Sequence, residues 1–155
     1  MRKRRRHRSL PSTNFAPSTV PYRMSVDDLV VESRATTGPV SDSPFCAMDG
    51  VSCLRGHAKR PTDNWNKILQ PLPGGVLECG SVRQGSCTLR SSDDVTRTLK
   101  EFPVAVAANS ENASTTWLSI VPGGLMVAAS HTEDSPYREV PTIAYRALDD
   151  LQVGI

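Results

Sequence analysis

The chain has 155 residues, a length that suits one domain of ordinary size. Hydrophobic residues make up 38%, and 12 prolines with 10 glycines favour short strands and many turns over long helices. No apolar run approaches the roughly 20 residues that a membrane-spanning helix requires, which excludes such a span.

Charge is concentrated at one end of the chain. The formal net charge is +2, but basic residues crowd Met1–Arg8 and the remainder has more acidic than basic residues. A polar, proline-rich stretch follows this basic head where a signal peptide would have an apolar region, so we expect no secretory signal in this chain. The head could instead bind nucleic acid or direct nuclear import. No aromatic platform, zinc motif or recognition helix accompanies it, and we favour a solvated tail.

The start of the chain is expected to differ from the rest. Residues 1–25 are expected to be disordered, because prolines punctuate a Ser/Thr-rich stretch with few large apolar residues. Residues 26–155 are expected to form the folded part. A run rich in β-branched residues predicts a first strand at Leu29–Arg34, which ends before the turn signal Gly38-Pro39. Residues 40–63 follow as a long loop that a local disulfide would pin.

Short strands separated by tight turns then recur along the chain. Before the polar loop at 109–114, we expect strands at residues 66–72, 76–82, 86–92 and 103–108, with residues 95–102 undecided between helix and strand. After that loop, we expect strands at residues 115–121, 124–130 and 141–148. Two successive sets of antiparallel strands predict an all-β fold of four-stranded blades, part of a β-propeller that is too short to close into a ring.

Four cysteines, Cys46, Cys53, Cys79 and Cys87, allow three pairings and form no C-x-x-C zinc or redox motif. Disulfides are favoured over free thiols. In CGSVRQGSC, Cys79 and Cys87 lie symmetrically about a turn at Arg83, so an antiparallel pair of strands would bring them within reach of a disulfide. Closing so small a loop would stabilise the fold by roughly 2.5 kcal/mol. The alternative is a pair of buried free thiols in register.

Four pieces of sequence resemble the Sema domain of plexins, in the order found in that family. They are TTGPVSDSPFC, which ends at Cys46; TDNWNKILQ, from Thr62; LECGSVRQGSC, from Leu77; and VAANSENAST, followed by LMVAASHT and YREVPTIAYRAL. The resemblance runs from about Leu29 to Leu151. It implies the end of a first propeller blade, a complete second blade and most of a third. The hairpin motif is shared with the hepatocyte growth factor receptor group, and VAANSENAST favours plexins.

The resemblance also implies roles for the cysteines and for the parent protein. Near-neighbour pairing in the family gives Cys46 with Cys53 and Cys79 with Cys87. The complete parent propeller would bind a semaphorin at the extracellular side of the plasma membrane, in signalling for axon guidance. We expect no enzyme activity, cofactor, metal, nucleic acid or small-molecule substrate, and contact with the membrane only through other parts of the parent. The alternatives are a growth-factor receptor tyrosine kinase and a small basic-tailed nuclear protein.

Asn112-Ala113-Ser114 is an N-glycosylation sequon within the expected polar loop. If the chain enters the secretory pathway, we expect Asn112 to carry a glycan. Trp65 stands where the family favours a small or aliphatic residue, and we expect it, like Trp117, to pack in the core or between blades. The three histidines are scattered and form no catalytic arrangement.

Overall fold

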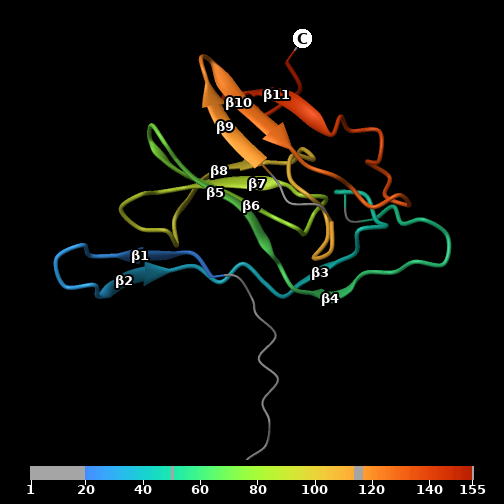
Figure 1. Ribbon diagram of the computed structural model, residues 1–155. Coiled ribbons are helices and arrows are strands. Elements are labelled where there is room, and N and C mark those ends of the chain that lie inside the picture. Colours follow the sequence, from blue (N-terminus) through green and yellow to red (C-terminus); the bar gives the residue numbers. More distant parts are fainter. Residues whose placement is uncertain (1–19, 50, 114–116, 155) are drawn as a thin grey trace, which may run out of the picture.

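The computed structural model describes residues 20–49, 51–113 and 117–154. Within these ranges the chain forms eleven strands and no helix, arranged as four antiparallel sheets (Figure 1). The expected all-β fold class is therefore confirmed. Residues 1–19 lie outside the described residues, so the disorder expected there stays a prediction. The disordered tail expected over residues 1–25 extends too far at its C-terminal end, because strand β1 occupies Tyr22–Met24.

The central sheet has four strands in the order β5-β6-β7-β8. Its strands are Asn66–Leu72, Gly75–Gly80, Cys87–Arg90 and Thr98–Phe102. Each strand is antiparallel to the one before it, so the sheet is an uninterrupted meander of hairpins. This is the complete blade that the sequence predicted, and the strand expected at residues 66–72 has those bounds.

The fourth strand of this blade was placed wrongly from the sequence. The strand is β8, which lies within the undecided stretch 95–102, and residues 103–108 are not a strand. These apolar residues are buried in a connection instead. All four of the last residues are at most 5% exposed: Ala105, Val106, Ala107 and Ala108. The amides of Val106 and Ala107 both donate to the Gly85 carbonyl, so this segment lies against the β6–β7 turn rather than extending the sheet.

A second sheet contains β9 (Trp117–Val121), β10 (Gly124–Ala128) and β11 (Ile143–Ala147) in sequence order. All three strands fall within ranges expected from the sequence. Figure 1 shows this orange sheet lying over the green and yellow four-stranded sheet. The main hydrophobic core lies between the two sheets and joins Ile68 and Leu77 of the first to Leu125 and Val127 of the second.

Two small ribbons complete the fold. One ribbon pairs β1 with β2 (Val31–Arg34), and Figure 1 shows it projecting from one side of the molecule. The other pairs β3 (Val40–Asp42) with β4 (Arg60–Thr62), inside the stretch that the sequence predicted to be loop. Each has only three or four residues per strand, which is too short to leave a clear alternating pattern in the sequence.

Candidate functional site

The two cysteines of the central hairpin face each other across β6 and β7. Cys79 is the register partner of Cys87, their Cα atoms are 4.1 Å apart, and a disulfide joins them. Both cysteines are buried in the core between the two large sheets. The disulfide therefore closes the hairpin at the end of its ladder, where the chain enters the connecting turn.

The turn between these cysteines has an unusual backbone. Arg83, Gln84 and Gly85 all have positive φ, at 49°, 60° and 76°. Non-glycine residues rarely adopt this region, so surrounding contacts must hold the first two residues in it. Gly85 is required for space as well, since a Cβ atom there would overlap the backbone carbonyl of Ala107. The turn therefore depends on the segments packed around it.

Gln84 is the centre of those contacts. Its side chain is 1% exposed, and its amide nitrogen donates to the carbonyls of Pro44, at 2.9 Å, and Cys46, at 2.6 Å. Its amide oxygen accepts from Asn109 Nδ2 and from Ser135 Oγ, each at 2.8 Å. A primary amide has two donors and two acceptor positions, and all four are used here. Gln84 thus joins three segments that are far apart in the sequence.

The same junction continues into the loop that precedes β11. Asn109 uses its Oδ1 to accept from the Thr132 amide at 3.0 Å, which fixes the second side of its side chain. Nε2 of His131 lies 3.4 Å from the Gln84 carbonyl oxygen. Burial lowers the pKa of His131 and outweighs this hydrogen bond, and the nearby Arg146 guanidinium lowers it further. The junction therefore favours neutral His131.

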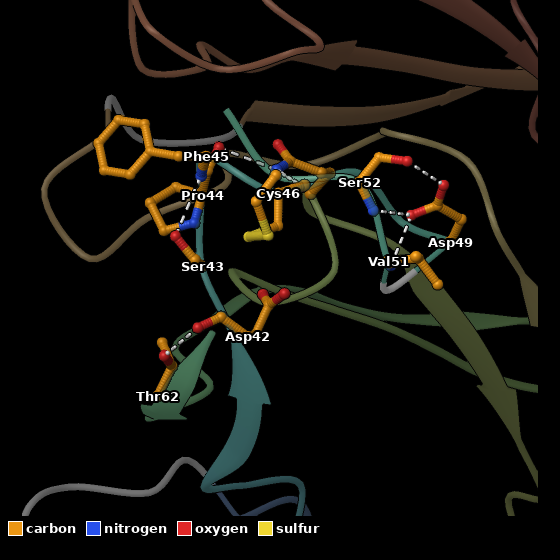
Figure 2. Close-up of a disulfide and its surroundings, with 11 residues drawn as sticks. Asp42, Ser43, Pro44, Phe45, Cys46, Asp49, Val51, Ser52 and Thr62 are labelled. Carbon is orange, nitrogen blue, oxygen red and sulfur yellow. Dashed lines mark hydrogen bonds between the residues drawn. A yellow bond between two sulfur atoms is a disulfide. The ribbon is translucent and has the colours of Figure 1, made fainter. Parts of the chain in front are cut away.

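The second disulfide, Cys46–Cys53, closes a small loop beside this junction. Figure 2 shows how the loop is organised by its own polar groups. Asp49 accepts hydrogen bonds from the amides of Val51, at 2.9 Å, and Ser52, at 3.0 Å, and from the Ser52 hydroxyl at 2.8 Å. These bonds, led by the Ser52 amide, lower the pKa of the exposed Asp49 carboxyl. The loop is thus held both by the disulfide and by the hydrogen bonds of the Asp49 carboxylate.

Asp42 connects β3 to the central hairpin. Its side chain is buried, and its Oδ2 accepts from the Arg83 amide at 2.6 Å. Its carbonyl accepts from the Thr62 hydroxyl at 2.9 Å (Figure 2). The β3–β4 ribbon is therefore tied to the same turn that Gln84 anchors, and the segment from Asp42 to Cys46 lies against the four-stranded sheet.

Three charged side chains on the strands are buried or largely buried. Glu78 of β6 forms an ion pair with Arg90 of β7 on the face opposite the disulfide, and both side chains are largely buried. Arg146 of β11 is 3% exposed and donates to the carbonyls of Ala105, at 2.8 Å, and Leu151, at 3.2 Å. Arg146 therefore holds the segment after β8 to the second sheet by hydrogen bonds to neutral groups.

The sequon residue Asn112 lies exposed in the turn that follows the buried Asn109. Ser114 lies outside the described residues. The turn is held to the central sheet by Lys67, whose Nζ donates to the Glu111 carbonyl at 3.2 Å. Partial burial lowers the pKa of Lys67. The structure thus places the asparagine of the sequon at the surface, next to the first strand of the complete blade.

Polar side chains of this site form hydrogen bonds between segments: Gln84 bonds Asn109 and Ser135, and Arg146 bonds the Ala105 carbonyl. Among the residues that the structure describes, no three His, Cys, Asp or Glu side chains gather as metal ligands would. The part of the chain that is described also contains no helix able to cross a membrane. His57 stacks on Phe45, with ring centroids 4.1 Å apart.

Sequence reasoning singled out the cysteines and Asn112 but missed Gln84, Asn109 and Asp42, and the glycosylation of Asn112 stays a prediction. The hairpin sequence offered one signal that its turn is unusual. If the two cysteines form a disulfide, the three residues at the turn must reverse the chain between them. The buried partners of Gln84 come from residues 44, 46, 109 and 135, and no sequence pattern links positions so far apart.

Comparison with known proteins gives the family of this segment. No protein-family model matches the chain. Plexin-2 of Caenorhabditis elegans is 44% identical over 132 residues, which cover 84% of this chain and 7% of that protein. Human Plexin-B1 is 33% identical over 150 residues, which cover 90% of this chain and 7% of that protein. The chain thus spans about 7% of the length of these relatives.

The solved structures agree with the sequences. The full extracellular region of plexin A4 superposes on 86% of this chain with a TM-score of 0.64 and 25% sequence identity, over 15% of the plexin A4 chain. A second structure of that region gives the same TM-score. Over this segment the chain belongs to the plexin family, and its sheets form part of a Sema-type β-propeller.

Proposed function

We propose that this chain is a sector of the semaphorin-binding propeller of a plexin-like receptor, on the extracellular side of the plasma membrane. The observation that carries the proposal is the similarity to plexins, which extends over most of the chain and includes the extracellular fold. The buried polar junction supports it. Hydrogen bonds of Gln84 and Arg146 join the blade to the neighbouring segments, which suits a blade that must keep its position within a larger propeller.

On this proposal the sector acts by binding and not by catalysis. Its contribution is rigidity, because surface loops can present a fixed binding face only when the blades beneath them hold their positions. Both disulfides suit the oxidising environment outside the cell. We further propose that the parent receptor couples semaphorin binding to signalling for axon guidance, and that Asn112 is glycosylated in the secretory pathway.

A segment exchange tests this function. Residues 20–154 of the chain would replace the matching segment in the extracellular region of Plexin-2 of Caenorhabditis elegans, to which it is 44% identical. We expect the chimaera to be secreted and to bind the semaphorin ligand of the unmodified receptor with similar affinity, measured by biolayer interferometry. A chimaera that is secreted and folded but has lost semaphorin binding would contradict the proposal.

A further inference from the structure

A groove of about 230 Å³ lies beside the sequon asparagine. Its walls come from β3 and β4, from the segment that enters β5, and from the turn at residues 109–112. The residues that matter for the argument are Asp42, Arg60, Asp63, Trp65, Glu111 and Asn112. Asn112 and Trp65 therefore line one hollow, although 47 residues separate them in the sequence and only one of them was expected to contribute to a surface site.

Both walls of the groove are fixed. The backbone of Trp65 is held on two sides by Ser81, whose hydroxyl accepts from the Trp65 amide at 3.0 Å and whose amide donates to the Trp65 carbonyl at 2.9 Å. On the other side, Lys67 Nζ holds the Glu111 carbonyl, and Asn109 is anchored in the junction. The backbone of Trp65 and the turn that carries Asn112 are thus each held in place on either side of the groove.

The composition of the groove suits a carbohydrate. Trp65 is only partly buried and is one of the residues that line the groove. An aromatic face of this kind packs against the C–H face of a sugar ring. Asp63, Arg60 and Glu111 bring carboxylates and a guanidinium to the rim, where they can bond sugar hydroxyls and the acetamido group.

We propose that this groove seats the first N-acetylglucosamine of a glycan on Asn112, with its ring against Trp65. The inference rests on the proposed function, because the glycan is added only in the secretory pathway. A seated sugar would cover the indole and connect the turn after Asn109 to the start of β5.

The test measures how well the glycan core is shielded. The full chain, expressed with a secretion signal in cells that add only high-mannose glycans, is treated with an endoglycosidase that cleaves between the two core N-acetylglucosamine residues. We expect cleavage of the native chain to be several-fold slower than cleavage of the denatured chain. W65A and W65L should raise the native rate towards the denatured rate, whereas W65F, which keeps an aromatic face, should retain the protection.

The controls separate shielding from misfolding. Tyr22 is an exposed aromatic residue away from the groove, so Y22A should leave the cleavage rate unchanged. Non-reducing peptide maps show whether each variant keeps both disulfides, and W65L preserves apolar bulk if W65A fails to fold. S114A removes the sequon and identifies the glycan at Asn112.

Two results would overturn the inference, and neither depends on semaphorin binding. If Asn112 of the secreted chain carries no glycan, the groove has no sugar to bind and the inference is wrong. A glycan on Asn112 that is cleaved equally fast in wild type, W65F and W65L would show that the sugar does not rest on the indole. The chimaera described above tests the proposed function separately, so its failure can be told apart from either result.

Discussion

At the scale of single residues, Gln84 explains more of the fold than any charged group. Its amide is buried and makes four hydrogen bonds to three separate segments. Removing one partner of a buried hydrogen bond costs the desolvation of the groups left behind. The backbone of Gln84 also has positive φ, which these same contacts maintain.

We therefore expect Q84A to lower the free energy of unfolding by about 3 kcal/mol, because it leaves buried carbonyl, amide and hydroxyl groups unpaired. Urea denaturation of the full chain measures the loss. Gln70 provides the matched control, since it lies on β5 and its amide bonds only the neighbouring Pro71 carbonyl. A Q84A variant no less stable than Q70A would contradict the role assigned to the junction.

His131 gives the junction a dependence on pH. Its pKa in the folded chain lies below its ordinary value of 6.5, first through burial and then through the charge of Arg146. The unfolded chain consequently binds more protons than the folded chain as the pH falls below that value. The stabilisation by neutral His131 is complete above the unfolded pKa and is lost as the pH falls towards the folded pKa.

We expect the urea midpoint to fall between neutral pH and about pH 5, and H131Q to reduce that fall. H57Q, which removes the other histidine that the structure describes, serves as the control: the His57 ring stacks on Phe45, whereas His131 contacts the Gln84 carbonyl and lies near Arg146, so H57Q should leave the pH dependence in place. An equal fall in wild type and H131Q would show that other groups cause it.

At the scale of elements, prediction from sequence succeeded where strands were long and turns were marked. The run at 66–72 has β-branched and apolar residues and ends at a Pro-Gly turn, and it became β5. Prediction failed for β1, β3 and β4, because strands of three residues are too short to leave an alternating pattern in the sequence. It failed at residues 103–108 because small apolar residues are needed equally in a strand and in a buried connection between blades.

The hairpin disulfide is the strongest local constraint in this blade. Replacing both cysteines in C79A/C87A should lower the free energy of unfolding by about 2.5 kcal/mol, since the loop that the disulfide closes is short. Denaturant midpoints of this pair and of C46A/C53A provide the measurement. The loss should be greater at Cys79 and Cys87, where both side chains leave the main core, than at the partly exposed Cys53. The opposite order would contradict this account.

At the scale of the whole molecule, two exposed apolar residues are suited to contact with other polypeptide segments. Val26 is 88% exposed in the turn of the β1–β2 ribbon, and Ile143 is 65% exposed on β11, which borders its sheet. Apolar residues on open strands promote association. The match covers only about 7% of the length of these plexins, so those proteins contain much further chain beyond the matched segment.

We expect the isolated chain to self-associate, and V26K with I143K to reduce the associated fraction in light scattering coupled to size exclusion. Lysine on the edge strand β11 discourages strand pairing, and lysine in place of Val26 removes an exposed apolar side chain. E133K, a lysine at an exposed polar position, is the control for added charge alone. A wild-type chain that is monomeric with a sharp melting transition would contradict this prediction.

Non-reducing peptide mapping tests the folded sector most directly. Trypsin cleaves after Arg34, Arg55, Lys67, Arg83 and Arg90. The structure predicts one linked species that joins peptides 68–83 and 84–90 through Cys79 and Cys87, and a separate peptide 35–55 with Cys46 and Cys53 joined internally. A disulfide that links peptide 35–55 to either of the other two would show that the hairpin and its junction do not form as described.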